Sequence, residues 1–176
     1  STGSGKGGET DTRAGFFERV AEHLSPVRGP VILAGPGFIK DDFMKYLRSR
    51  NEDLAGRIKV VETRRMGTGA VQEVIGLGIL EKIHEDMQLG REVRCMEELL
   101  VRIAKELPYA YGRGQVEKAV DCGAVEEVLV ADSLIRDDQV NHLMERAELL
   151  KARITVFSTE FDPGRQLEAL GGVAAL

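Results

Sequence analysis

Short apolar runs alternate with amphipathic helical segments along the chain, and this alternation limits the possible folds more than any other feature of the sequence. The apolar runs, of strand length, are residues 31–34, 58–62, 128–131 and 154–158. Between them, apolar residues recur at the three- and four-residue spacing of a helix that packs one face on a core. Such alternation predicts helices that flank a largely parallel sheet, so the fold class is α/β.

The 176 residues are enough for two small domains, each with its own core. A long helical region separates the two sets of strands, with Val93, Met96, Leu100 and Ile103 as its predicted buried stripe. We place the boundary between residues 86 and 90. The sequence therefore predicts two consecutive three-layer α/β/α domains, residues 1–87 and 88–176.

Composition narrows the function classes. The formal net charge is −5 and charged residues make up 30% of the chain, so any contact with RNA must come from local basic patches. Two cysteines and three histidines lie apart in sequence without ligand spacing, which favours reduced thiols and no metal or cofactor. No apolar run is long enough for a membrane span, and we expect a soluble, cytoplasmic protein without a membrane partner.

The first dozen residues are rich in glycine and polar side chains, and they predict a flexible loop that precedes a helix from Ala14. Their sequence GSGKGGE superficially resembles a phosphate-binding P-loop. No strand precedes it, however, and Gly7 follows Lys6 where a Ser or Thr would be needed to hold magnesium. A P-loop is therefore excluded.

A glycine turn, GPGF at residues 35–38, joins an apolar run to a charged helix. Glycine amides in such a position can bind phosphate, but the GxGxxG spacing of a dinucleotide site is missing and Glu62 is the sole acidic candidate for a ribose contact. Pro36 makes the turn rigid and Phe38 places a large apolar ring at its end. These features favour packing or a protein contact over a nucleotide.

Five segments in order, FFERVAEHL, GPGFIKDDF, MGTGAVQEVI, YGRGQVEKAVDCGAVEEVLVAD and STEFDPGRQLEALGGVAAL, closely resemble the archaeal members of the Pelota family. That family is related to the class-1 peptide-release factors. The resemblance covers nearly the whole chain and corresponds to the family's central and C-terminal domains, without the N-terminal Sm-like domain. The second domain also resembles the fold of ribosomal proteins that bind kink-turn RNA.

The resemblance implies a monomeric ribosome-rescue factor, a tRNA mimic in mRNA surveillance and no-go decay. Its implied partners are a translational GTPase of the elongation factor 1-alpha type, the ribosome and its RNA, and an ABC-type ATPase that splits the subunits. The residues implied to contact the GTPase lie in two turns, and they are Gly35, Pro36, Gly37, Phe38, Phe161, Pro163 and Gly164. The residues considered for contact with ribosomal RNA are basic, and they are Lys6, Arg13, Arg64, Arg65 and Arg113.

Enzymatic activity is not expected. Release factors hydrolyse peptidyl-tRNA with a Gly-Gly-Gln loop, and the nearest string here, residues 112–115, is interrupted by Arg113 and lies at a helix start. A nuclease role suggested for the family has no supporting residue set in this chain. Two alternatives remain at this stage: an RNA-binding α/β protein related to the kink-turn binders, and a hydrolase acting on peptidyl-tRNA.

Overall fold

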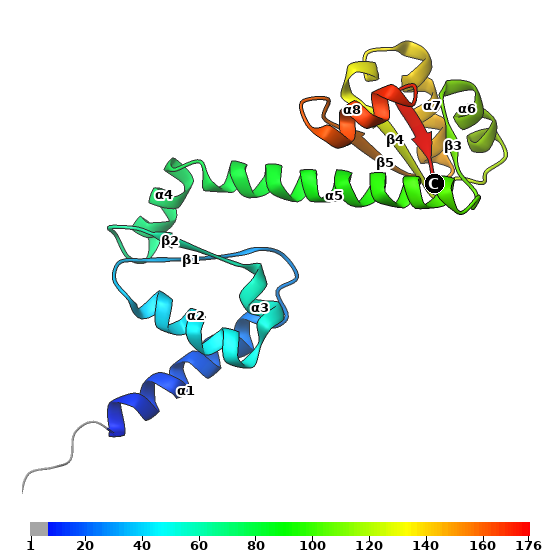
Figure 1. Cartoon of the computed structure of the whole chain (residues 1–176). Coiled ribbons are helices and arrows are strands. Elements are labelled where there is room, and N and C mark those ends of the chain that lie inside the picture. Colours follow the sequence, from blue (N-terminus) through cyan, green and yellow to red (C-terminus); the bar gives the residue numbers. More distant parts are fainter. Residues whose placement is uncertain (1–6) are drawn as a thin grey trace, which may run out of the picture. The chain divides into compact units, whose positions relative to one another are not determined.

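The computed structural model describes residues 7–176 and divides the chain into two compact units, Ser1–Ile83 and His84–Leu176. This division lies close to the predicted boundary. Helix α5 (Ile79–Ala104) runs through it, and Figure 1 shows the elements of each unit. Each unit has a hydrophobic core of its own.

The first unit is built on two parallel strands, β1 (Val31–Gly35) and β2 (Ile58–Glu62), which pair residue for residue along their length. Helices α1 (Gly7–Leu24), α2 (Ile39–Arg50), α3 (Glu52–Arg57) and α4 (Thr68–Gly76) complete it. The first three share a core with Leu33 of β1 and Ile58 of β2, while α4 lies on the other side of the strands (Figure 1). The unit therefore has helices on both faces of its sheet.

The expected loop at the N-terminus is partly wrong, because α1 begins at Gly7 and not near Ala14. Glycine costs up to about 1 kcal/mol in a helix, but the segment continues the amphipathic helix whose Phe17 is packed in the core beside Phe43 and Tyr46. The helix that Phe17 anchors in the core therefore extends back through these residues, which local composition does not indicate.

The second unit contains a four-stranded mixed sheet in the order β3-β6-β4-β5. Strands β4 (Glu127–Ala131) and β5 (Arg153–Phe157) are parallel, as the sequence predicts. The short strands β3 (Ala110–Tyr111) and β6 (Val173–Ala175) were not expected, and β6 runs antiparallel to both of its neighbours. The helical elements are η1 (Asp132–Leu134), α6 (Arg113–Asp121), α7 (Asp138–Leu149) and α8 (Asp162–Ala169).

Two apolar clusters cover the two faces of this sheet and confirm its three-layer architecture. Side chains of α6 and α7 pack on one face, where Val128 and Val130 of β4 point. Side chains of α5 and α8 pack on the other face, where Leu129 of β4 and Phe157 of β5 point. The alternation along β4 explains why the entire strand is buried.

The buried face of α5 differs from the predicted stripe. Val93 and Leu100 are 37% and 47% exposed, whereas Cys95 and Leu99 join Met96 in the core. Glu92 is also fully buried; its Oε1 accepts hydrogen bonds from the Ser158 amide and the Gln88 side chain. The buried face of α5 is therefore rotated relative to the predicted stripe. The prediction missed it because a search for apolar residues does not count a hydrogen-bonded glutamate, Glu92, or a cysteine, Cys95, as core residues.

No helix within residues 7–176 combines the length and apolar character that crossing a bilayer requires. In the same region, the His, Cys, Asp and Glu side chains form no group that could hold a metal ion.

Candidate partner-binding surface

The glycine turn between β1 and α2 presents an exposed aromatic side chain. Gly35 ends β1, Gly37 has a positive φ of 74°, and Phe38 is the residue from which α2 starts. Phe38 is 82% exposed and its neighbour Ile39 is 59% exposed. A positive φ favours glycine, so the sequence specifies a tight turn that turns the ring outward.

The buried side chain of Lys40 holds this turn from the protein side. The side chain is 7% exposed, and its ammonium donates to the Gly37 carbonyl and forms an ion pair with Glu62. Glu62 is the last residue of β2 and is the cross-strand partner of Gly35. The hydrogen bond from Lys40 is the main cause that lowers the pKa of the Glu62 carboxyl. The carboxylate that could have held a ribose is therefore already used to brace the turn.

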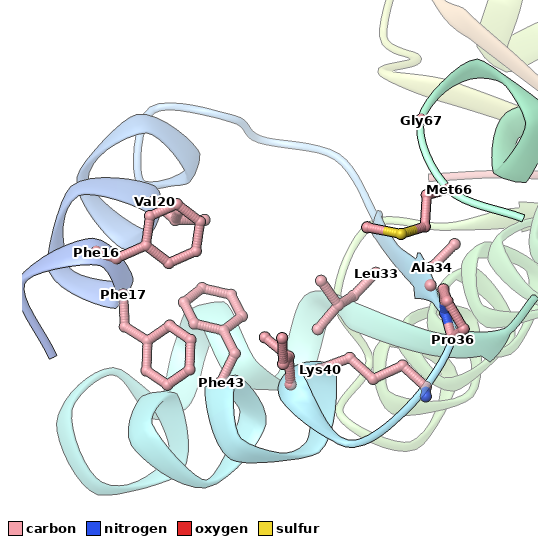
Figure 2. Close-up of a pocket in the computed structure, with 12 residues that line it drawn as sticks. Phe16, Phe17, Val20, Leu33, Ala34, Pro36, Lys40, Phe43, Met66 and Gly67 are labelled. Carbon is pink, nitrogen blue, oxygen red and sulfur yellow. The ribbon is translucent and has the colours of Figure 1, made fainter. Parts of the chain in front are cut away.

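An apolar pocket of about 270 Å³ lies beside the turn (Figure 2). Its walls come from α1, from β1 and the turn, from the start of α2, and from the loop before α4; examples are Phe16, Leu33, Pro36, Ile39 and Met66. Met66 is 76% exposed and Phe16 is 51% exposed. Together with Phe38 they make an apolar surface of the kind that marks interaction sites on folded proteins.

The loop with Arg64 and Arg65 is held by its backbone. The Glu73 carboxylate accepts hydrogen bonds from the Arg64 amide at 3.0 and 3.1 Å and from the Arg65 amide at 3.3 Å. The Thr63 hydroxyl, which is buried, donates to the Arg65 carbonyl. Both arginines are exposed, and within the described part of the chain no ion pair holds either guanidinium. Their contact with RNA remains a prediction.

Two of the other basic residues predicted to contact RNA already have acidic partners within the protein. Arg13 lies within α1, not in a loop, and its guanidinium is 3.4 Å from Asp42 of α2. Arg113 donates to Asp137 and to Gln139, both at 2.7 Å, so it ties the start of α6 to the start of α7. Its hydrogen bond is the main cause that lowers the pKa of Asp137. Lys6 lies outside the described residues.

The second turn predicted to contact the GTPase is largely inside the core. Pro163 and Gly164 are buried in the first turn of α8, and Phe161 alone among the three is partly exposed. A Cβ atom at Gly164 would lie 2.0 Å from the Ser158 carbonyl oxygen. Pro163 and Gly164 allow α8 to pack closely against the end of β5, and a docking role for them stays an untested prediction.

Comparison with known proteins agrees with this architecture. Residues 89–176, half of the chain, match the family model described as eRF1 domain 3. The whole chain is 55% identical to a "Protein pelota homolog" of Methanoregula boonei, of which it covers 52%. The chain belongs to the Pelota family. It spans about half the length of the curated family members it matches.

Solved Pelota structures have the same fold. The chain is 35% identical to Pelota of Archaeoglobus fulgidus, with a TM-score of 0.69 over 92% of this chain and 52% of that one. With a model of ribosome-bound archaeal Pelota and ABCE1, the TM-score is 0.73 at 36% identity, over 92% of this chain and 48% of that one. The recognition of the family from its five sequence segments is thereby confirmed.

Sequence reasoning missed Lys40, which holds the turn, and the apolar residues Phe16, Ile39 and Met66 beside it. The apolar spacing predicts a helix from Asp41 to Arg50, which leaves Lys40 just outside it, whereas α2 begins at Ile39 and places this lysine in its first turn, where its charge opposes the helix dipole. That mismatch was the available signal, because a cation at a helix start needs a specific partner. The structure supplies two, the Gly37 carbonyl and Glu62.

Proposed function

We propose that this chain acts in ribosome rescue during mRNA surveillance and no-go decay, as a monomeric, cytoplasmic, tRNA-mimicking binding module. In this role the turn at residues 35–38 binds a translational GTPase of the elongation factor 1-alpha type. The GTPase delivers the protein to stalled ribosomes, and an ABC-type ATPase then separates the subunits. The module itself catalyses no reaction.

The exposed Phe38 carries this proposal. A phenyl ring that is 82% exposed is costly to leave in water, whereas the backbone beneath it is braced by Lys40. A rigid turn loses little conformational entropy on binding, which favours its use as an anchor. Aromatic side chains of this kind dominate the binding energy of many interfaces. Family membership and the ribosome-bound archaeal relative support a place on the ribosome.

Hydrolysis of peptidyl-tRNA is disfavoured by the site that most resembles a catalytic loop. Gly112 to Gln115 form the entry to α6, where Gly112 has a positive φ of 75° and Arg113 is engaged by Asp137. The same ion pair argues against an RNA site of the kink-turn type, because the cation at that helix start is already partnered. Neither alternative has a specific observation in its favour.

The test is a calorimetric titration of the chain against archaeal elongation factor 1-alpha, loaded either with a non-hydrolysable GTP analogue or with GDP. We expect binding that depends on the GTP analogue, and Phe38→Ala should weaken it by at least about tenfold. The variant should leave stability nearly unchanged, because the ring packs against little of the protein.

Leu149→Ala is the matched control, because Leu149 is 83% exposed and lies in the second unit. It should bind as the unmodified chain does. Absence of binding to either nucleotide form by a folded chain would reject the proposal. Equal loss in both variants would show that exposed apolar area, and not the turn, determines the interaction.

A further inference from the structure

A polar pocket of about 300 Å³ in the second unit is lined by three arginines. Arg91 and Arg94 come from α5, and Arg153 comes from the start of β5. The spacing of Arg91 and Arg94 places both on one face of the helix. The remaining lining residues are Cys95, Glu98 and Glu127. Such a concentration of guanidinium groups is unusual in a chain whose net charge is −5.

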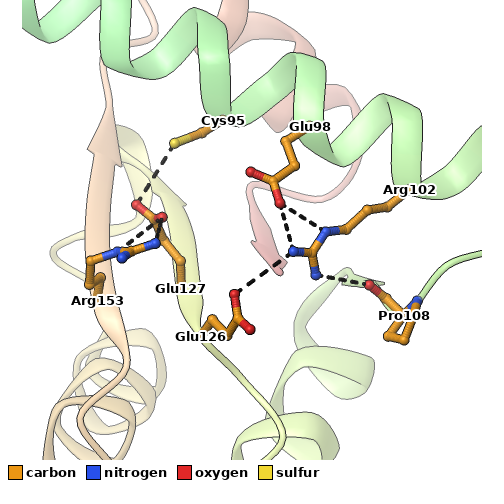
Figure 3. A network of polar contacts seen from close by, with 7 residues as sticks. All are labelled: Cys95, Glu98, Arg102, Pro108, Glu126, Glu127 and Arg153. Atoms are coloured by element: carbon orange, nitrogen blue, oxygen red, sulfur yellow. Dashed lines mark hydrogen bonds and ion pairs between the residues drawn. The ribbon is translucent and has the colours of Figure 1, made fainter.

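The floor of the pocket is a buried glutamate whose two oxygens are both occupied (Figure 3). Glu127 Oε1 accepts from the Thr155 hydroxyl at 2.6 Å and from the Cys95 thiol at 3.8 Å. Its Oε2 accepts from Arg153 Nη2 at 3.0 Å and Nε at 3.3 Å. Burial by itself would raise the pKa of Glu127, but the hydrogen bonds from Thr155 and Arg153 outweigh it and lower the pKa. The acid is thus ionised and committed to these partners.

The second acid that lines the pocket, Glu98, is held by an arginine outside it. Glu98 Oε1 accepts from Arg102 Nη2 at 2.6 Å and from Nε at 3.1 Å (Figure 3). Arg102 also donates to the Pro108 carbonyl, which fixes its guanidinium at that end of the helix. Arg91 and Arg94 consequently keep their charge unpaired: no acidic side chain of the described residues forms an ion pair with either.

We propose that Arg91, Arg94 and Arg153 form a binding site for a phosphate group of an RNA backbone. Planar guanidinium groups bind phosphate through paired hydrogen bonds, and here two of them have free donors while the third is held rigid by Glu127. The pocket has room for one phosphate and offers no aromatic ring for base stacking. It therefore recognises the backbone and not the sequence.

This inference rests on the proposed ribosomal role, which brings the second unit near RNA. It differs from the RNA contacts predicted from the sequence. Those were placed at Arg113 and in the first unit, whereas this site joins α5 to the edge strand β5. The pocket belongs entirely to the second unit, so it does not require any particular arrangement of the two units.

Fluorescence anisotropy with a labelled RNA hairpin of arbitrary sequence tests the site. The chain should bind the hairpin with an affinity that falls steeply with salt concentration. The double variant Arg91→Gln/Arg94→Gln should weaken binding at least about tenfold and make the slope of log K against log salt shallower by about one for each lost phosphate contact. Arg136→Gln, a change of an exposed arginine outside the pocket, should leave binding unchanged.

Circular dichroism first establishes that the variants are folded. Binding of inorganic phosphate at millimolar concentration, measured by calorimetry, with no binding of the hairpin would assign the pocket to a free anion and overturn the RNA proposal. Equal affinities for the chain and the double variant, or no binding of RNA at all, would also overturn it. The titration against elongation factor 1-alpha is independent of these arginines, so its success or failure identifies which proposal is at fault.

Discussion

The two proline–glycine turns of the molecule have similar sequences and opposite environments. GPGF follows β1 and leads into α2, while FDPG follows β5 and leads into α8. In the first turn Phe38 is 82% exposed, whereas in the second Pro163 and Gly164 are buried. Both were expected to contact the same GTPase. The comparison shows that one turn is suited to contact and the other to packing.

The two turns differ in exposure because side chains from other elements hold them differently. Residue Asp132, which follows β4, holds the loop before α8 through the Thr159 amide and hydroxyl, at 3.1 and 2.7 Å. Glu92 of α5 holds the same loop through the Ser158 amide at 3.2 Å. The first turn is held from the protein side, by the Lys40 ammonium on the Gly37 carbonyl and by the hydrogen bond from the Gly37 amide to Glu62. Phe38, on its outer side, is exposed.

The largest expected effect is that of Gly164→Ala, compared with Gly35→Ala. A Cβ at Gly164 would meet the Ser158 carbonyl oxygen at 2.0 Å, so α8 or the loop must move, whereas a Cβ at Gly35 meets nothing within 4 Å. We expect a loss of about 3 kcal/mol or more for Gly164→Ala, and less than about 1 kcal/mol for Gly35→Ala. Urea unfolding followed by circular dichroism measures both.

Equal stability of these two alanine variants would contradict the comparison, because the second turn would then tolerate a side chain as the first does. The same crowding makes substitutions of Gly164 unsuitable as probes of binding. A larger side chain there would disturb the fold before it could report on a partner.

A smaller loss is expected for Asp132→Ala. Removing the carboxylate leaves the Thr159 amide and hydroxyl without their acceptor in a partly buried loop, which costs about 1–3 kcal/mol. Asp121→Ala is the control, since it removes only an exposed ion pair with Arg146 at 3.5 Å and should cost less than about 1 kcal/mol. Hydrogen exchange at the Thr159 amide should increase in the first variant alone; unchanged protection would refute the role of Asp132.

The sequence predicted elements whose signal is local. The bounds of β2 were predicted to the residue. Apolar spacing predicts Val140, Leu143, Met144 and Ala147 as the inward residues of α7; Met144 is partly buried and the other three are fully buried. A carboxylate at the end of a buried strand, as at Asp132, often caps the turn that follows it, but Asp132 binds the loop before α8 instead. Thr159, its partner, and Ser158, which donates to Glu92, lie far away in sequence, so no spacing could have indicated these two contacts.

The candidate surface was predicted unevenly for the same reason. Exposure of Phe38 followed from a turn that glycine and proline specify locally. Pro163 and Gly164 are buried because α8 packs against the end of β5. Arg113 is not free to bind RNA because it forms an ion pair with Asp137, at the start of α7. Residues with similar local sequence patterns thus differ in exposure and in partners, and only contacts between segments distant in sequence determine that difference.

The smallest expected effect concerns the brace of the first turn. Lys40→Met keeps the buried stem but removes the hydrogen bond to Gly37 and the ion pair with Glu62, and we expect a loss of at most about 1 kcal/mol. Binding of the GTPase should weaken, because Phe38 is then held on a looser turn. The same change at Lys45, on the same helix and without a brace to make, provides the control.

The pH dependence separates this brace from general effects of charge. The pKa of Glu62 in the folded chain is lowered, chiefly by the hydrogen bond from Lys40. Its ion pair is therefore present above 4.5, the ordinary pKa of a glutamate, and is lost as the pH falls through the lower, folded pKa. In acid the amide resonances of Gly37 and Phe38 should therefore shift in the unmodified chain and in Lys45→Met. In Lys40→Met the acid shift should be smaller and its midpoint should move up toward the ordinary pKa of a glutamate, because only the hydrogen bond from the Gly37 amide to Glu62 remains. An acid shift of unchanged size and midpoint in Lys40→Met would mean that Lys40 does not hold the turn, and the contrast between the two turns would have to be abandoned.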